Sequence, residues 1–318
     1  MHPASPSITT RTPGKVNLLL AVGECGDDGY HPVVSVYHAV QLYEDVTVAW
    51  SPEWQLSFRG GRPMPVTDDN LVLRAGRLLA AEATPFLTDN SPERLTASIA
   101  VRKRVPIAGG MAGGSADAAG TLVALAKLWR LDVPKAQLAR IAAKLGSDVP
   151  FALRGGTSIG TGRGDRLAPV IAAPTFHWVM ITRSGGLSTP AVYSKFDEMV
   201  AAGEIEASAE QPALAHAEAV VTALASGDAH ALAPLLQDDL QSAAISLLPE
   251  LQQTIDAGVR HGALAGIVSG SGPTVALLAD SAHGAAALAQ SMLARGHDAR
   301  VVSGPTRGAH VLDADDEA

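Results

Sequence analysis

The chain has 318 residues, a length that predicts two domains rather than a single small core. It carries 32 acidic and 24 basic side chains, and this net charge of -8 argues against broad binding to nucleic acid. The single cysteine, Cys25, excludes an internal disulfide and a zinc cage made of cysteines. A lone cysteine fits a reducing cytoplasm, which is where we expect the protein.

The apolar run VNLLLAV at residues 16–22 is a weak candidate for a secretion signal. It contains the polar Asn17, and Glu24 stands directly before Cys25, where a lipoprotein signal needs a small residue. No run of roughly 18 apolar residues without a charge occurs anywhere in the chain. We therefore expect a soluble protein that does not associate with a membrane.

Elements of the first half follow from hydrophobic period and turn residues. A turn-rich loop with three glycines, residues 23–32, separates the first two strands, and Asp69 or Asn70 can cap the first helix. In chain order we expect strands at 16–22, 33–42 and 45–50, a helix at 69–83, a strand at 96–105, and helices at 115–129 and 134–146.

The composition changes in the second half, where glycine-rich turns and alanine-rich helical stretches become frequent. We therefore place a domain boundary near residue 166, with domains 1–166 and 167–318. The acidic end, residues 313–318, is expected to be a disordered tail. In chain order we expect a hairpin at 154–167, a strand at 176–183, helices within 191–261 with a flexible connection at 202–212, a glycine cluster at 266–278, a helix at 282–294, and a strand around Val301.

The segment PIAGGMAGGSADAAG, residues 106–120, places four glycines within six residues between a strand and a strong helix. Glycines there let the backbone approach an anion and direct N–H groups of the helix N-terminus toward it. A tightly packed turn is the alternative, but it would need only one or two glycines. Neither G-x-x-x-x-G-K-[ST] nor G-x-G-x-x-G fits the segment, so we expect a third type of phosphate loop.

Three motifs in order resemble those of the GHMP kinase superfamily, which includes galactokinases, homoserine kinases and mevalonate kinases. They are TPGKVNLLLAV at 12–22, the glycine loop, and VSGSGPTVALL at 268–278. The resemblance implies an α+β, two-domain GHMP kinase fold. It has a ribosomal protein S5 domain 2-like N-terminal domain and a ferredoxin-like C-terminal domain, and ATP and the acceptor meet between them.

Residues 14–46 and the segment LGSDVPFAL at 145–153 more narrowly resemble the family of 4-diphosphocytidyl-2-C-methyl-D-erythritol kinases. That resemblance implies in-line phosphorylation of the acceptor's 2-hydroxyl, a step of non-mevalonate isoprenoid biosynthesis. The loop departs from the family at Ala108 and Ala112, where glycine is frequent, and at Ala116, where serine is frequent. Since alanine keeps its N–H group, we expect phosphate binding to survive.

Asp148 and Lys15 are the catalytic candidates. The turn before Val-Pro holds Asp148 stiffly, and the sequence alone is equally compatible with a helix cap at this position. The family resemblance favours Asp148 as the general base that takes the acceptor hydroxyl's proton, with the Lys15 ammonium orienting it and offsetting phosphoryl charge.

The resemblance also implies binding residues, an ATP cofactor with Mg²⁺, and a small-molecule partner that carries a cytidine diphosphate group. His31 would hydrogen-bond the cytosine edge, while Tyr30 and Tyr193 would stack on it. Ser115 is the one candidate contact for Mg²⁺, and we assign no metal ligands. The expected ATP contacts are Pro106, Ile107, Ala108, Gly109, Gly110, Met111, Ala112, Gly113, Gly114, Ser115, Ala116, Lys103 and Asn70. The expected acceptor contacts are Asn17, Tyr30, His31, Tyr193, Thr189, Gly270, Ser271 and Gly272.

Two alternatives remain at this stage. One is a GHMP kinase with another small acceptor, such as homoserine or mevalonate, which would leave Tyr30 and His31 without a role. The other is a non-catalytic nucleotide sensor on the same fold, which the presence of both Lys15 and Asp148 disfavours. The sequence does not indicate an oligomeric state.

Overall fold

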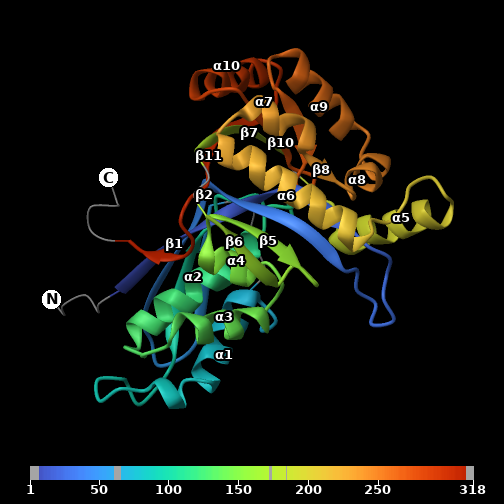
Figure 1. The fold of residues 1–318 in the computed structure, drawn as a ribbon. Coiled ribbons are helices and arrows are strands. Elements are labelled where there is room, and N and C mark those ends of the chain that lie inside the picture. Colours follow the sequence, from blue (N-terminus) through green and yellow to red (C-terminus); the bar gives the residue numbers. More distant parts are fainter. Residues whose placement is uncertain (1–6, 61–65, 172–173, 184, 313–318) are drawn as a thin grey trace.

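Two β-sheets organise the chain, and helices cover them (Figure 1). The computed structural model describes residues 7–60, 66–171, 174–183 and 185–312. The acidic tail predicted at 313–318 therefore lies outside the described residues. None of the described helices combines the length and apolar character needed to cross a membrane.

The first sheet is built on two long antiparallel strands, β1 and β2. The sequence predicted two strands for the region of β2. Pairing with β1 continues through Tyr43 and Glu44, however, so one strand results. The order is β12-β1-β2-β4-β3, with β5 paired to β2, β6 paired to β5, and β8 parallel to β1. The strands are β1 Ser7–Val22, β2 Val33–Trp50, β3 Gln55–Arg59, β4 Ala97–Arg102, β5 Thr157–Thr161, β6 Arg166–Val170, β8 Gln237–Asp238 and β12 His310–Val311.

Helices of the first half pack their apolar faces on this sheet. Asn70 caps α1 through its side-chain oxygen, which accepts from the Val72 N–H at 3.0 Å. Leu79, Leu122 and Trp129 lie in the core between these helices and the sheet. The helical elements are α1 Leu71–Ala81, the 3₁₀ turn η1 Thr84–Phe86, α2 Gly113–Leu128, α3 Lys135–Ala143 and α4 Val149–Arg154.

The second sheet is antiparallel, with the order β11-β7-β10-β9. In sequence order this is 4-1-3-2 with helices after the first and third strands, the ferredoxin-like arrangement that we expected. The strands are β7 Phe176–Thr182, β9 Ala265–Val268, β10 Val275–Ala279 and β11 Asp298–Gly304. The helical elements are α5 Thr189–Ala201, α6 Glu210–Ser226, α7 Ala229–Leu232, the 3₁₀ turn η2 Ala233–Leu235, α8 Gln241–Leu247, α9 Glu250–Arg260 and α10 Ala282–Leu293.

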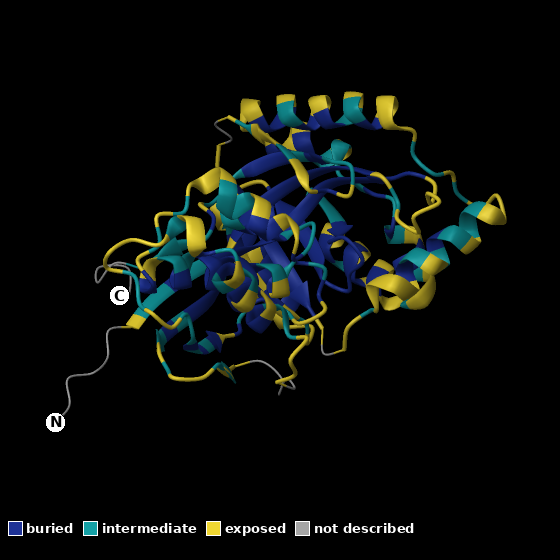
Figure 2. Ribbon diagram, turned by 90° about the horizontal axis from the view of Figure 1, so that it is seen from below, coloured by how far each residue is buried: buried dark blue, intermediate teal, exposed yellow. Residues whose placement is uncertain are grey.

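The two halves share a hydrophobic core. Leu18 and Val36 of the first sheet pack in one cluster with Trp178 of the second sheet and Val220 of α6. Figure 2 shows strands as the buried interior, whereas the helices around them keep exposed faces in solvent. β6 continues to Val170, so the first sheet extends past the predicted boundary at residue 166, and the boundary itself stays a prediction.

Candidate active site

A cavity of about 970 Å³ opens where the glycine loop, β1 and the N-terminal end of α5 approach one another. Residues from both halves line it, which is the position that the resemblance implied. Most of the predicted site residues reach this cavity. They are Lys15, Asn17, Tyr30, His31, Pro106, Ala108, Gly109, Gly110, Ala112, Gly113, Gly114, Asp148, Thr189, Tyr193, Gly270 and Ser271.

Gly110 joins the three sequence motifs. Its carbonyl oxygen accepts from Lys15 Nζ at 2.8 Å and from Ser269 Oγ at 3.3 Å. Its φ is +75°, and a Cβ atom added to it would lie 1.8 Å from the Ser269 carbonyl oxygen, so only glycine fits. The backbone of β1 also holds the loop, because the Lys15 N–H donates to the Met111 carbonyl at 3.1 Å.

The loop ends at the N-terminus of α2, whose first turn faces the cavity. Ala108 and Ala112 adopt left-handed conformations, with φ of +52° and +57°. Ala112 occupies the N-cap position and offers no side chain to cap the helix. A Cβ atom on Gly114 would meet nothing within 4 Å, so free N–H groups and open space coincide here. This is the setting that favours a bound anion.

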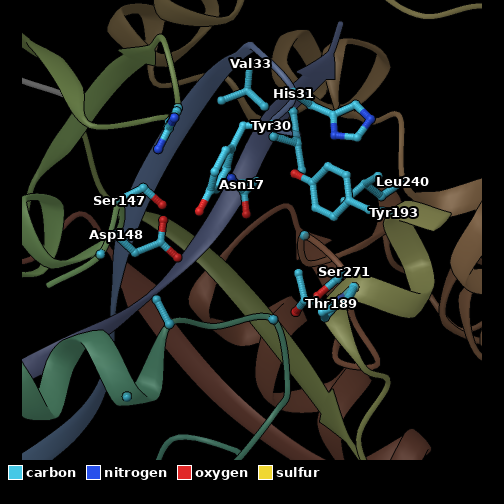
Figure 3. Close-up of a pocket in the computed structure, with 18 of the residues that line it drawn as sticks. Asn17, Tyr30, His31, Val33, Ser147, Asp148, Thr189, Tyr193, Leu240 and Ser271 are labelled. Atoms are coloured by element: carbon cyan, nitrogen blue, oxygen red, sulfur yellow. The ribbon is translucent and has the colours of Figure 1, made fainter. Parts of the chain in front are cut away.

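Asp148 presents its carboxylate to the cavity, opposite Thr189, Tyr193 and Ser271 (Figure 3). It stands at the N-cap position of α4, yet its side chain makes no capping hydrogen bond. The capping alternative is therefore wrong for this side chain. The backbone before Pro150 fixes the residue's position and leaves the carboxylate available for chemistry.

Lys15 shares the cavity with Asp148 but does not contact it. The Lys15 ammonium donates to Asn17 Oδ1 and to the Gly110 carbonyl oxygen. Lys15 and Asn17 are two positions apart on β1, so their side chains leave the same face. Asn17 Nδ2 in turn donates to Ser35 Oγ at 2.7 Å. The direct Lys15–Asp148 pair that we expected is thus absent among the described ion pairs, and the ammonium is fixed beside the glycine loop instead.

Aromatic rings line the other end of the cavity. The rings of His31 and Tyr193 lie 4.9 Å apart at 39°, and His31 Nε2 lies 2.7 Å from Asp197 Oδ1. Tyr30 is 55% exposed, and the Arg163 guanidinium lies 3.7 Å from the centre of its ring. Burial raises the pKa of the Tyr193 hydroxyl above its ordinary range, so this group stays protonated and can donate.

Comparison with known proteins decides the family. A model of the GHMP kinase N-terminal domain matches residues 70–156, and one of the C-terminal domain matches residues 220–298. A protein of Mycolicibacterium smegmatis is 48% identical over 97% of this chain and 93% of its own length. The chain belongs to the GHMP kinase family. The M. smegmatis relative is named 4-diphosphocytidyl-2-C-methyl-D-erythritol kinase, as is a relative of Rhodococcus jostii that is 48% identical over 96% of this chain and 95% of its own length.

Solved structures agree with this assignment. A crystal structure of 4-(cytidine 5'-diphospho)-2C-methyl-D-erythritol kinase matches this GHMP kinase with a TM-score of 0.72 and 30% identity. The match covers 92% of this chain and 98% of the chain in that crystal structure. Homoserine kinase from Cytophaga hutchinsonii has a TM-score of 0.71 at 19% identity, over 98% of this chain and 99% of its own. That second likeness shows the shared fold alone.

Two predicted ATP contacts of this GHMP kinase have other partners in the structure. Asn70 caps α1, as described above. Lys103 is buried, with its Nζ 2.7 Å from Glu44 Oε1 and 2.6 Å from Asp117 Oδ2. Burial raises the pKa of both carboxyl groups, that of Glu44 to about 7 and that of Asp117 to about 6, against the opposing charge of Lys103. This ion-pair geometry gives no support to a phosphate contact by Lys103.

Other predicted contacts also stand outside the lining of the cavity in the described part of the chain. Met111 is fully buried beneath the loop, where it packs in the core shared by the two halves. Ser115 lies half-buried in the first turn of α2, and Ala116 is buried behind it. Ile107, Asn70, Lys103 and Gly272 complete this set.

Sequence reasoning missed several residues of the site. Arg163 lies in the turn of the predicted hairpin, but only the pairing of Tyr37 with Ser158 brings that turn to the cavity. Asp197 reaches the cavity from α5, where its Oδ1 lies 2.7 Å from His31 Nε2. Neither residue is in a recognisable motif, so no sequence signal distinguished it.

Proposed function

We propose that this GHMP kinase transfers the γ-phosphoryl group of ATP to the 2-hydroxyl of 4-diphosphocytidyl-2-C-methyl-D-erythritol. The observation that carries the proposal is a single cavity with a glycine loop and the uncapped Asp148 carboxylate at one end and aromatic rings at the other. The names of the 48% identical relatives support the same acceptor. The product would serve non-mevalonate isoprenoid biosynthesis.

At the phosphate end, the N–H groups of the loop and of α2 would hold the nucleotide's phosphates. Lys15 would neutralise charge on the transferred group, because Asn17 and the Gly110 carbonyl oxygen already hold its ammonium beside the loop. Asp148 would accept the proton of the acceptor hydroxyl as the oxygen attacks phosphorus in line. Gly270 and Ser271 close this side of the cavity.

At the aromatic end, Tyr30 and Tyr193 offer faces on which a base can stack, and His31 offers a ring nitrogen to its edge. The hydrogen bond between His31 Nε2 and Asp197 leaves Nδ1 for the base. Arg163, whose guanidinium lies over Tyr30, would offset the charge of the acceptor's diphosphate.

Magnesium would accompany ATP in this scheme. Mg²⁺ keeps several waters and is held by nucleotide phosphates with few protein oxygens. The described residues fit that mode, because Asp117 is bound to Lys103 and Ser115, in the first turn of α2, does not line the cavity. The nucleotide's phosphates and water would therefore hold the ion, which supplies charge neutralisation on the phosphates.

The test is ADP release by the purified protein with Mg-ATP and one acceptor at a time. The acceptors are 4-diphosphocytidyl-2-C-methyl-D-erythritol, homoserine and mevalonate. Turnover with the cytidylated alcohol alone is expected. Turnover with homoserine or mevalonate instead would show that the proposed acceptor is wrong. If none of the three is turned over although ATP binds tightly, the result would favour a nucleotide sensor.

A further inference from the structure

A thiol, an imidazole and a carboxylate meet at the aromatic end of the cavity. The ligand atoms of Cys25, His31 and Asp197 all lie within 4.8 Å of one another. Cys25 and His31 come from the loop between β1 and β2, and Asp197 comes from α5. All three residues line the cavity. The fold therefore brings together three different metal-binding side chains from two separate segments.

The spacing of these atoms suits one small cation. Zinc binds sulfur at about 2.3 Å and nitrogen or oxygen at about 2.0–2.2 Å, which places neighbouring ligand atoms roughly 3.5 Å apart in a tetrahedron. One adjustment needed is between His31 Nε2 and Asp197 Oδ1, now 2.7 Å apart. The Asp197 side chain is 46% exposed, so it can rotate to widen that distance.

The surroundings fix one ligand and leave two adaptable. The His31 side chain is only 7% exposed, and its ring packs against Tyr193 and, at 6.0 Å, against Phe196. Cys25 is exposed, and its Sγ has one weak contact, 3.7 Å from the Gly26 carbonyl oxygen. A thiolate with an imidazole selects zinc over the hard cations Mg²⁺ and Ca²⁺.

We propose that Cys25, His31 and Asp197 form a binding site for Zn²⁺, and that the bound ion obstructs the acceptor end of the cavity. Three protein ligands leave a fourth position for water. The ion would use the His31 nitrogen that now faces Asp197 and would stand on the cavity wall between the loop and α5. Zinc binding stands without the proposed function, whereas the inhibition rests on it.

The binding test uses the metal alone on the reduced, full-length protein without nucleotide. Because Cys25 is the single cysteine, thiolate-to-metal charge-transfer absorption on addition of Co²⁺ reports this site and no other. We expect the band with wild-type protein, its displacement by Zn²⁺, and its loss in Cys25→Ser. Calorimetry should give one Zn²⁺ per chain, with affinity at least tenfold lower in Cys25→Ser and in Asp197→Asn.

His261→Ala, at the end of α9, is the matched control, because it removes an imidazole away from the cavity and should bind Zn²⁺ like wild type. Absence of the band, or equal Zn²⁺ affinity in wild type and Cys25→Ser, would overturn the site. In kinetics, Zn²⁺ should raise KM for the acceptor, not for ATP, and Cys25→Ser should resist it. If the proposed function is wrong, no turnover will be seen, but the titration with Co²⁺ and Zn²⁺ will still measure metal binding.

Discussion

Asp148 stands at the N-cap position of α4 but does not cap the helix. Its side chain makes no capping bond to α4, and no described ion pair joins it to Lys15. A carboxylate that contributes little to folding can be changed with small structural cost. Its replacement therefore separates catalysis from stability more cleanly than a change at Lys15, whose ammonium links β1 to the glycine loop.

For Asp148→Asn we expect a fall in kcat of about 10²–10⁴-fold, because the amide cannot accept the hydroxyl proton. Nucleotide affinity should remain near the wild-type value, since the glycine loop is unchanged. Steady-state ADP release and equilibrium nucleotide binding measure the two quantities. Asp256→Asn on the exposed face of α9 is the matched charge control, and turnover of Asp148→Asn close to that of this control would refute the base assignment.

At the scale of elements, the junction between the glycine loop and α2 contains a strained residue that orients the start of the helix. Ala112 adopts φ +57° at the helix N-cap, where an L-residue with a Cβ atom is strained by about 1 kcal/mol. The left-handed turn directs the first N–H groups of α2 toward the cavity. The strain thus belongs to the part of the loop that is proposed to hold phosphate.

Ala112→Gly should release this strain, offset in part by the larger entropy of glycine in the unfolded chain. We expect the free energy of unfolding to stay constant or rise by up to about 1 kcal/mol in urea titrations. Ala286→Gly, at an exposed position inside α10, is the control and should lose about 1 kcal/mol. An equal loss in both variants would show that Ala112 is unstrained.

At the scale of the whole molecule, ionisable groups are buried where the sheets and helices meet. His38 of β2 is fully buried, and its Nδ1 lies 2.9 Å from Thr157 Oγ1. Burial lowers the pKa of His38 from 6.5 to about 4. The unfolded chain therefore takes up a proton at higher pH than the folded chain, and the stability due to neutral His38 is lost as pH falls from 6.5 to 4.

Glu44 and Asp117 act in the opposite direction, because their raised pKa values favour the folded state as pH falls below about 7. A comparison of His38→Gln with wild type isolates the histidine. We expect the difference between their free energies of unfolding to change by about 3 kcal/mol between pH 7.5 and pH 4, in favour of the variant at low pH. A constant difference across that range would contradict the assignment.

Local sequence was a good guide to elements that neighbouring residues stabilise. The helix over 282–294 was predicted nearly to its ends because its apolar period matches the face it buries, and the strand over 176–183 because a continuous apolar run is buried on both sides. Boundaries were poorer where tertiary pairing decides them. β2 is continuous through Tyr43 because β1 pairs with it there, and α2 begins two residues before Ser115 because the left-handed Ala112 starts the turn.

Within the site, motif residues were accessible to sequence reasoning and their partners were not. The glycine loop, Lys15, Asp148 and His31 carry recognisable patterns, and the structure brings them to one cavity. Lys103 also fits a motif, but its ammonium meets Glu44 and Asp117, and such a buried ion pair is visible only in three dimensions.

The sequence by itself determined the family, the order of the motifs and the chemistry available to each, because these depend on residue types at short spacings. Tertiary structure alone decided which of those groups meet. Lys15 contacts Asn17 and Gly110 rather than Asp148, and Asp197 reaches His31 from α5. Such contacts depend on strand register and on the packing of two halves around one core, and neither is encoded in a local pattern.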